Sequence, residues 1–177
     1  MPIQKPVKRV VTPKEEFFYQ AIGLVHAPVK VQVFVNPEGQ TIYKFLLLLE
    51  QPYQLTLKHC GEYFYKKFCS FVQSHQDPFY PGQSLPIWLR VYPQYNAHKK
   101  KWRFQVVHWN VLNPTEEGFL LKGVSQKVPI LNGNFFTIYR NQVAGSKRYF
   151  KNLYLPVENL AVPLFVPQRG AKNQPTF

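Results

Sequence analysis

The sequence predicts an all-β fold with one short helix, and three observations support this prediction. Hydrophobic residues make up 45% of the 177 residues, which is enough apolar material for a packed core. The chain contains 16 prolines and 9 glycines, a composition that favours many turns over long helices. Several segments alternate apolar and polar residues with a period of two, which is the pattern of half-buried strands.

Four strand-like segments occupy the first part of the chain, at residues 17–25, 29–35, 41–49 and 53–58. Gly23 lies inside the first segment, where glycine indicates a bulge, a sharp bend or a close approach to the backbone. A turn at residues 36–39 separates the second segment from the third, and Pro52 ends the third. We therefore expect consecutive strands joined by short turns.

The period of the sequence changes over residues 61–75. Phe64, Phe68, Phe71 and Val72 follow the spacing of an amphipathic helix. Cys69 falls beside Phe68, so we expect a buried structural cysteine rather than a metal ligand. A helix is therefore predicted between the fourth strand and the next pair.

Residues 86–110 are expected to form a hairpin of two strands, in which Pro93 and Asn96 are turn residues. Strands, then one helix, then two more strands is the order of the five-stranded OB-type barrel. The sequence thus predicts an OB-like barrel at residues 15–112. The hairpin would close that barrel.

A second, smaller or incomplete OB-like β-unit is predicted at residues 118–167. Its first stretch repeats the opening pattern, and Gly123 takes the place of Gly23. Asn132-Gly133-Asn134 is a hairpin turn signal. This unit has few residues for a closed five-stranded barrel. We therefore expect that it either packs on the first barrel or is completed by a partner. Residues 1–14 are predicted to form a basic flexible arm, and residues 168–177 are predicted to form a disordered tail.

The charge is strongly positive, with 22 Lys and Arg against 9 Asp and Glu, and a formal net charge of +13. No acidic residue occurs between Asp77 and Glu116, or between Glu117 and Glu158. Such long stretches of one sign favour nucleic acid or an anionic membrane surface as a partner. No amphipathic basic helix is evident, which makes the membrane the weaker of these two alternatives.

Basic and aromatic residues gather in the predicted hairpin and in the second unit, the combination that binds nucleic acid through phosphates and stacked bases. Each aromatic residue could instead be core, and the three lysines could be a solvated turn. The candidate nucleic-acid-binding residues are Arg90, Tyr92, Tyr95, Lys99, Lys100, Lys101, Arg103, Trp109, Tyr139, Arg140, Lys147 and Arg148.

Signatures of other protein classes are missing from the sequence. No run of about 18 apolar residues could span a membrane, and the N-terminus lacks the apolar region of a signal peptide. Two cysteines are too few for a disulfide framework, so a cytoplasmic location is expected. The few carboxylates and the absence of catalytic motifs predict no enzymatic activity, no cofactor and no metal.

The chain contains, in order, FYQAIGLV (18–25), IWLRVYP (87–93), FQVVHWN (104–110), GFLLKGV (118–124) and FFTIYRN (135–141). These stretches resemble segments of a family of uncharacterised basic cyanobacterial proteins. The resemblance covers most of residues 17–157 and implies an OB-like strand pattern without a catalytic signature. The chain ends earlier than family members, which continue into further strands.

Two functional hypotheses follow from these patterns. The first is a non-catalytic nucleic-acid-binding protein, with single-stranded or structured RNA slightly favoured over ssDNA. The alternative is a structural or accessory subunit of a larger nucleoprotein complex, acting mainly through protein–protein contacts.

Overall fold

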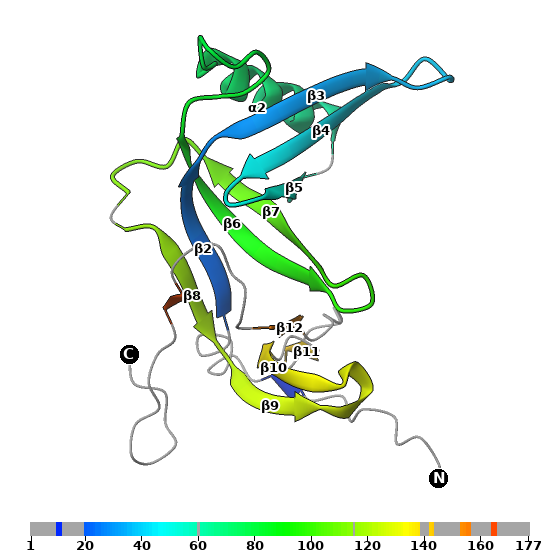
Figure 1. The fold of residues 1–177 in the computed structure, drawn as a ribbon, viewed down its shortest axis with the longest axis vertical. Coiled ribbons are helices and arrows are strands. Elements are labelled where there is room, and N and C mark those ends of the chain that lie inside the picture. Colours follow the sequence, from blue (N-terminus) through cyan, green and yellow to red (C-terminus); the bar gives the residue numbers. More distant parts are fainter. Residues whose placement is uncertain are drawn as a thin grey trace. The chain divides into compact units, whose positions relative to one another are not determined.

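The computed structural model describes residues 10–11, 20–59, 61–114, 116–138, 142–143, 153–156 and 164–165. The chain divides into a larger unit, residues 22–119 with 160–164, and a smaller unit, residues 1–21, 120–159 and 165–177. The described part is mostly strand, with one α-helix and one 3₁₀ turn (Figure 1). The predicted all-β class is therefore confirmed at this level.

One large sheet organises the larger unit. Its strands are β2 (Gln20–Ala27), β3 (Val29–Val35), β4 (Thr41–Leu48), β5 (Pro52–Leu57), β6 (Ile87–Asn96), β7 (Lys101–Trp109), β8 (Gly118–Lys122) and β13 (Leu164–Phe165). They lie in the order β13-β8-β2-β6-β7-β5-β4-β3. The pairs β2–β6, β6–β7, β5–β4 and β4–β3 are antiparallel, whereas β5 and β7 are parallel. Only Pro28 separates β2 from β3 in the chain.

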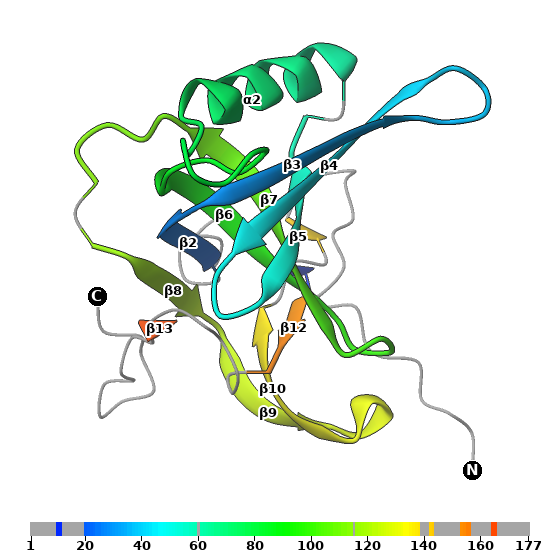
Figure 2. The same ribbon diagram turned by 45° about the horizontal axis from the view of Figure 1, so that its top comes forward.

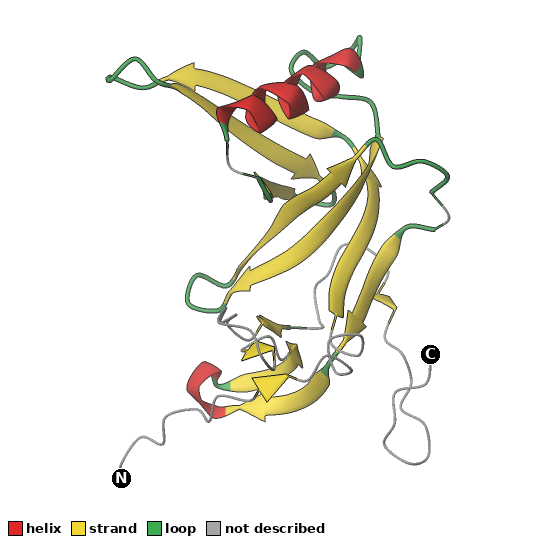
Figure 3. Cartoon of the chain, turned by 180° about the vertical axis from the view of Figure 1, so that it is seen from behind, coloured by secondary structure: helices red, strands yellow, loops and turns green. Residues whose placement is uncertain are grey.

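The predicted helix is confirmed as α2 (Glu62–Ser74). Phe68, Cys69 and Val72 are buried, and the Phe68 ring contacts the rings of Phe45 and Trp109 at centroid distances of 4.8 and 5.2 Å. Seen from behind, the helix covers the side of the β3–β4 hairpin that is hidden in Figure 1 (Figure 3). Burial raises the pKa of the Cys69 thiol, which keeps it protonated and makes it a packed apolar group.

The hairpin of β6 and β7 differs from its prediction at Pro93. That residue is buried within β6, opposite Phe104, and the turn spans residues 97–100. Proline is tolerated there because the described pairing with β2 ends at Val91, so its missing N–H costs no ladder bond on that side. Asn96 does order the turn, since its Oδ1 accepts the N–H of Lys99 at 3.0 Å.

Of the three alternatives that the sequence left open for Gly23, the structure shows a close approach to the backbone. A Cβ atom built there would lie 2.7 Å from Cζ of Phe119, a fully buried ring that packs on Phe104 at 5.6 Å. No side chain fits without displacing that ring. The glycine is therefore a packing requirement of the sheet.

We expect Gly23→Ala to lower the free energy of unfolding by about 1–3 kcal/mol, because the new methyl group overpacks the site. Chemical denaturation followed by circular dichroism measures this change. Gly61→Ala is the matched control, since a Cβ at Gly61 meets nothing nearer than Phe64 at 3.6 Å. Equal midpoints for the two variants would contradict the packing requirement.

The smaller unit contains a three-stranded antiparallel sheet in the order β12-β10-β9. Its elements are β9 (Val124–Val128), the 3₁₀ turn η1 (Pro129–Leu131), β10 (Gly133–Ile138) and β12 (Leu153–Leu155), and β1 (Val10–Val11) pairs in parallel with β11 (Gln142–Val143). The predicted hairpin is confirmed, but its loop is residues 129–132, closed by Asn132 in a left-handed conformation with φ 51°. Apart from β1, the predicted basic arm lies outside the described residues, as does the predicted tail.

Candidate nucleic-acid interface

The strands β2–β7 have a core side and a side that faces away from the core, here called the outer face. The core side carries the buried residues, among them Phe45, Leu55 and Phe104. Alternation and cross-strand pairing assign the outer-face side chains. They include Lys30, Gln32, Lys44, Leu46, Gln54, Arg90, Tyr92, Gln94, Arg103, Gln105 and His108.

One row of outer-face residues crosses the sheet from β3 to β6. Lys30 pairs with Leu46, Leu46 with Gln54, Gln54 with Arg103, and Arg103 with Gln94. At about 4.8 Å per strand, Lys30 and Arg103 lie roughly 14 Å apart across the sheet. The row thus places a cation on β3 and another on β7, with neutral polar or apolar side chains between them.

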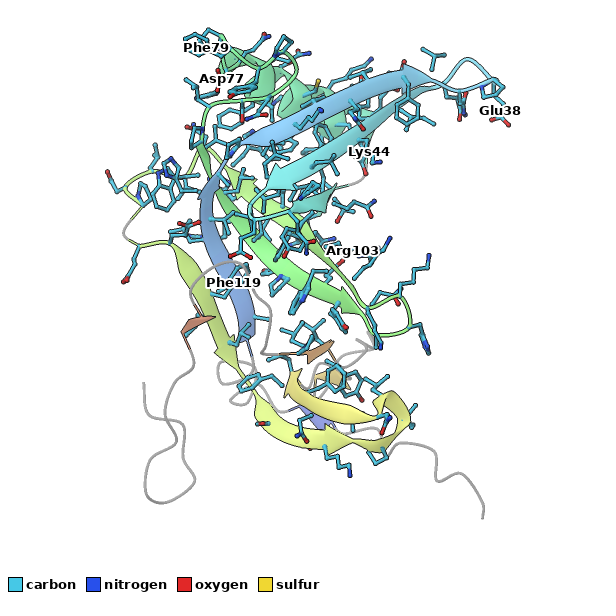
Figure 4. The ribbon with its side chains drawn as sticks, viewed as in Figure 1. Glu38, Lys44, Asp77, Phe79, Arg103 and Phe119 are labelled. Atoms are coloured by element: carbon cyan, nitrogen blue, oxygen red, sulfur yellow. The ribbon has the colours of Figure 1, made fainter. Side chains whose placement is uncertain are left out.

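Lys44 on β4 and Arg103 on β7 are two of the cations on this face (Figure 4). Lys44 pairs with Gln32 and so lies one row along from Lys30. The Nε–H of Arg103 donates to Oε1 of Gln94 at 2.7 Å, which orients the guanidinium without neutralising it. Both cations are exposed to solvent.

The six strands β2–β7 contain no Asp or Glu. Their five cations, all exposed, are Lys30, Lys44, Arg90, Lys101 and Arg103. Among the described residues, the ion pair that forms is Lys66 with Glu62, 2.9 Å apart on α2. Within the described residues, these strands therefore give the outer face a net positive charge, which attracts anions.

The turn of the β6–β7 hairpin extends this positive surface. Lys99, Lys100 and Lys101 are all exposed, and Lys101 lies two residues from Arg103 along β7. Two residues of strand span about 6.6 Å, close to the spacing of phosphates along a nucleic-acid strand. We call Lys30, Lys44, Arg103 and residues 99–101 together the basic strip.

The predicted aromatic residues do not all accompany the basic strip. Tyr92 is on the outer face, half-buried opposite Gln105. Tyr95 is opposite Trp102 and packs on it with ring centroids 5.1 Å apart, on the same side of the sheet as Phe104. The structure thus places Tyr92, but not Tyr95, on the same face of the sheet as the cations.

Trp109 lies on the core side because of a bulge in β7. Arg90 pairs with His108 but Val91 pairs with Val106, so Val107 is an extra residue. Side chains beyond Val107 change face, and the Trp109 ring packs against Phe68 of α2. Trp109 is therefore a packing residue of the helix.

A second group of outer-face residues surrounds Arg90. Arg90 is opposite Leu24 on β2 and His108 on β7, and all of these lie on the outer face. Trp88, two residues before Arg90, stacks on His26 with ring centroids 4.5 Å apart. Arg90 thus has aromatic neighbours but lies in a different row from Arg103.

The predicted residues Tyr139, Arg140, Lys147 and Arg148 lie outside the described residues. Conversely, sequence reasoning missed Lys30 and Lys44, which precede the long acid-free stretches. Their signal was present, because each lies between a buried and a half-buried apolar residue in a predicted strand. Only the pairing of β3 and β4 with the rest of the sheet connects them to Arg103.

In the described part of the chain, no group of three or more His, Cys, Asp or Glu residues is placed to hold a metal ion. No described helix is both long and apolar enough to cross a membrane. No model of a known protein family matches the chain, and no curated protein or solved structure is significantly similar to it. The resemblance to basic cyanobacterial proteins stays a prediction.

Proposed function

We propose that the larger unit is an OB-like barrel in which β2 and β3 act as one strand bent at Pro28. One half of that strand pairs with β6 and the other half with β4. Counting it once gives five strands in a ring, bent strand–β4–β5–β7–β6, with α2 between the third and fourth strands of the chain. This is the strand and helix order of the OB-type barrel.

We propose further that the protein binds single-stranded nucleic acid without catalysing a reaction on it. The observation that supports this most strongly is the basic strip on a sheet whose strands lack any carboxylate. OB-type barrels bind oligonucleotides on their second and third strands and on the loops that follow the first and fourth strands. Here those elements are β4 and β5 with residues 36–40 and 97–100, and the basic strip includes Lys44 on β4 together with Lys99 and Lys100 of the 97–100 turn.

The geometry favours phosphate contacts over base stacking. Tyr95 and Trp109 lie on the core side, which leaves Tyr92 and Trp88 as the half-buried outer-face aromatics of the hairpin. Phosphate contacts carry no sequence information, so we expect binding that tolerates many sequences. RNA and ssDNA present the same phosphates, and RNA is the first probe to test.

Binding of the full chain to fluorescein-labelled unstructured RNA and DNA oligonucleotides, measured by anisotropy across a salt series, tests this proposal. If the six cations of the basic strip each meet a phosphate, log K should fall linearly with log salt with a slope of about −4, at roughly −0.7 per contact. A flat response to salt, or no binding at low salt, would falsify the proposed function.

The second candidate function is a structural or accessory subunit of a nucleoprotein complex. It is supported by exposed apolar residues at the far end of the β3–β4 hairpin, where Val33, Phe34, Val35 and Ile42 are in contact with solvent. Such a surface favours a protein partner. The two functions are compatible, because the basic strip and this apolar end involve different residues.

A further inference from the structure

The outer face carries a second group of basic and aromatic side chains that is separate from the basic strip. It consists of His26 on β2, Trp88 and Arg90 on β6, and His108 on β7, and we call it the Arg90 patch. Because β6 lies between β2 and β7, the patch crosses three neighbouring strands of the sheet (Figure 2). All four residues belong to the larger unit.

The basic side chains of the Arg90 patch are exposed to solvent. Arg90 and His108 are directly opposite each other on neighbouring strands. Within the described residues, neither side chain forms a hydrogen bond or an ion pair. A guanidinium and an imidazole in this arrangement do not stabilise the sheet through charge, whereas both can donate hydrogen bonds to one phosphate.

A pair of stacked rings lies next to these two groups. Trp88 and His26 are directly opposite each other, with ring centroids 4.5 Å apart and ring planes inclined by 10°. The indole is half-buried and the imidazole is exposed. A nucleobase can extend such a stack, because every base has a π-face.

The Arg90 patch is aligned with the basic strip along β6. The outer-face residues of β6 follow one another as Gln94, Tyr92, Arg90 and Trp88, and Gln94 is opposite Arg103 of the strip. Each step of two residues spans about 6.6 Å, so the rows of Arg103 and Arg90 lie roughly 13 Å apart. This step is close to the phosphate spacing of an extended single strand. A strand held at Arg103 therefore reaches Arg90 about two nucleotides further along.

We propose that the Arg90 patch is a subsite for one nucleotide of the single strand that the basic strip binds. Arg90 and His108 hold the phosphate of this nucleotide, and its base stacks on the pair of Trp88 and His26. This inference rests on the proposed function and adds the path of the strand, which runs along β6. At one nucleotide for each step of about 6.6 Å, a strand that extends from Lys101 to Trp88 has about five nucleotides.

A carboxylate marks the end of the Arg90 patch on the side of β2. Oε1 of Glu117 accepts the backbone N–H of His26 at 3.2 Å. A phosphate placed beyond His26 would be repelled by this carboxylate. The phosphate contact is therefore expected on the side of β7, at Arg90 and His108.

Tryptophan fluorescence of the full chain tests the stacking contact. Trp102 packs on Tyr95 and Trp109 packs on Phe68, both on the core side of the sheet. Trp88 is therefore the tryptophan that a bound base can reach, and stacking should quench its emission. A saturating amount of an eight-nucleotide oligouridylate should lower the emission of the wild type and of the control Trp102→Phe. It should leave the emission of Trp88→Leu unchanged.

Anisotropy titrations with the same oligonucleotide, labelled with fluorescein, test the phosphate contact. Arg90→Gln should bind more weakly and reduce the magnitude of the slope of log K against log salt by about 0.7, the loss of one contact. Trp88→Leu should bind about tenfold more weakly with an unchanged slope. Lys67→Gln on α2 is the matched control for the loss of one positive charge and should keep the wild-type slope.

The two measurements separate this inference from the proposed function. Saturable binding of the wild type without quenching, or quenching that persists in Trp88→Leu, overturns the Arg90 patch and leaves the proposed function standing. A slope that is unchanged in Arg90→Gln does the same. No binding in the anisotropy titration overturns both.

Discussion

The double variant Lys44→Glu/Arg103→Glu is expected to bind single-stranded nucleic acid about tenfold more weakly, or worse, than the wild type. Each change removes an exposed cation from the outer face and replaces it with a charge that repels phosphate. A hydrogen bond to a charged group contributes about 1.5–3 kcal/mol, and tenfold in affinity is about 1.4 kcal/mol. Because both side chains are exposed to solvent, each contact contributes less than 1.5–3 kcal/mol, and we therefore expect the loss in affinity to be at least about tenfold. Anisotropy titrations at low salt measure the loss.

The control for this variant is Lys66→Glu/Lys67→Glu, which changes the net charge by the same amount. Lys66 and Lys67 are on α2, which packs on the core side of the sheet through Phe68. If the basic strip binds the ligand, the control should lose much less affinity than the outer-face variant. Equal losses would show that overall charge, rather than the strip, determines binding.

Phe104→Ala is expected to lower the free energy of unfolding by about 3–5 kcal/mol, the usual cost of removing a buried aromatic ring. Phe104 is 1% exposed, and its ring lies 5.3 Å from that of Tyr53 and 5.6 Å from that of Phe119. These contacts join β7 to β5 and β8. The cavity left by alanine would therefore loosen the sheet beneath the basic strip.

Urea denaturation followed by fluorescence and circular dichroism measures the effect of Phe104→Ala. Phe34→Ala is a suitable control, because its ring is 48% exposed and its loss should change stability by less than about 0.5 kcal/mol. A similar midpoint for Phe104→Ala and the wild type would mean that the core is not held together at Phe104.

Local periodicity predicted the elements of the larger unit well. The helix followed from the spacing of Phe64, Phe68 and Val72, because one face of a helix has to be apolar to be buried. The strand of residues 29–35 coincides with β3, since alternation and the flanking turn are both local signals. The close approach at Gly23 was one of three alternatives that the local sequence indicated. These features depend on residues near one another in the chain.

Features that depend on distant pairing were not predictable from the sequence. Pro93 resembles a turn residue, yet it lies within β6 because the neighbouring β2 does not pair with it there. Lys30 and Lys44 belong with Arg103 only through a register that runs over four strands. Neither fact is encoded in a local pattern, because the cross-strand register is set by the whole sheet.

The bulge at Val107 lets β7 direct side chains to solvent over one part of its length and to α2 over the other. Towards the turn, β7 directs Arg103 to solvent, and beyond the bulge it directs Trp109 to α2. If β7 ran on past Val106 without the bulge, the imidazole of His108 would face Phe68 and the indole of Trp109 would face water. An insertion or deletion in the regular part of β7, between residues 102 and 106, would turn the side chains that follow it to the opposite face, whereas a substitution changes one side chain at a time. The position of the extra residue therefore determines which side chains of β7 lie on the outer face and which face α2.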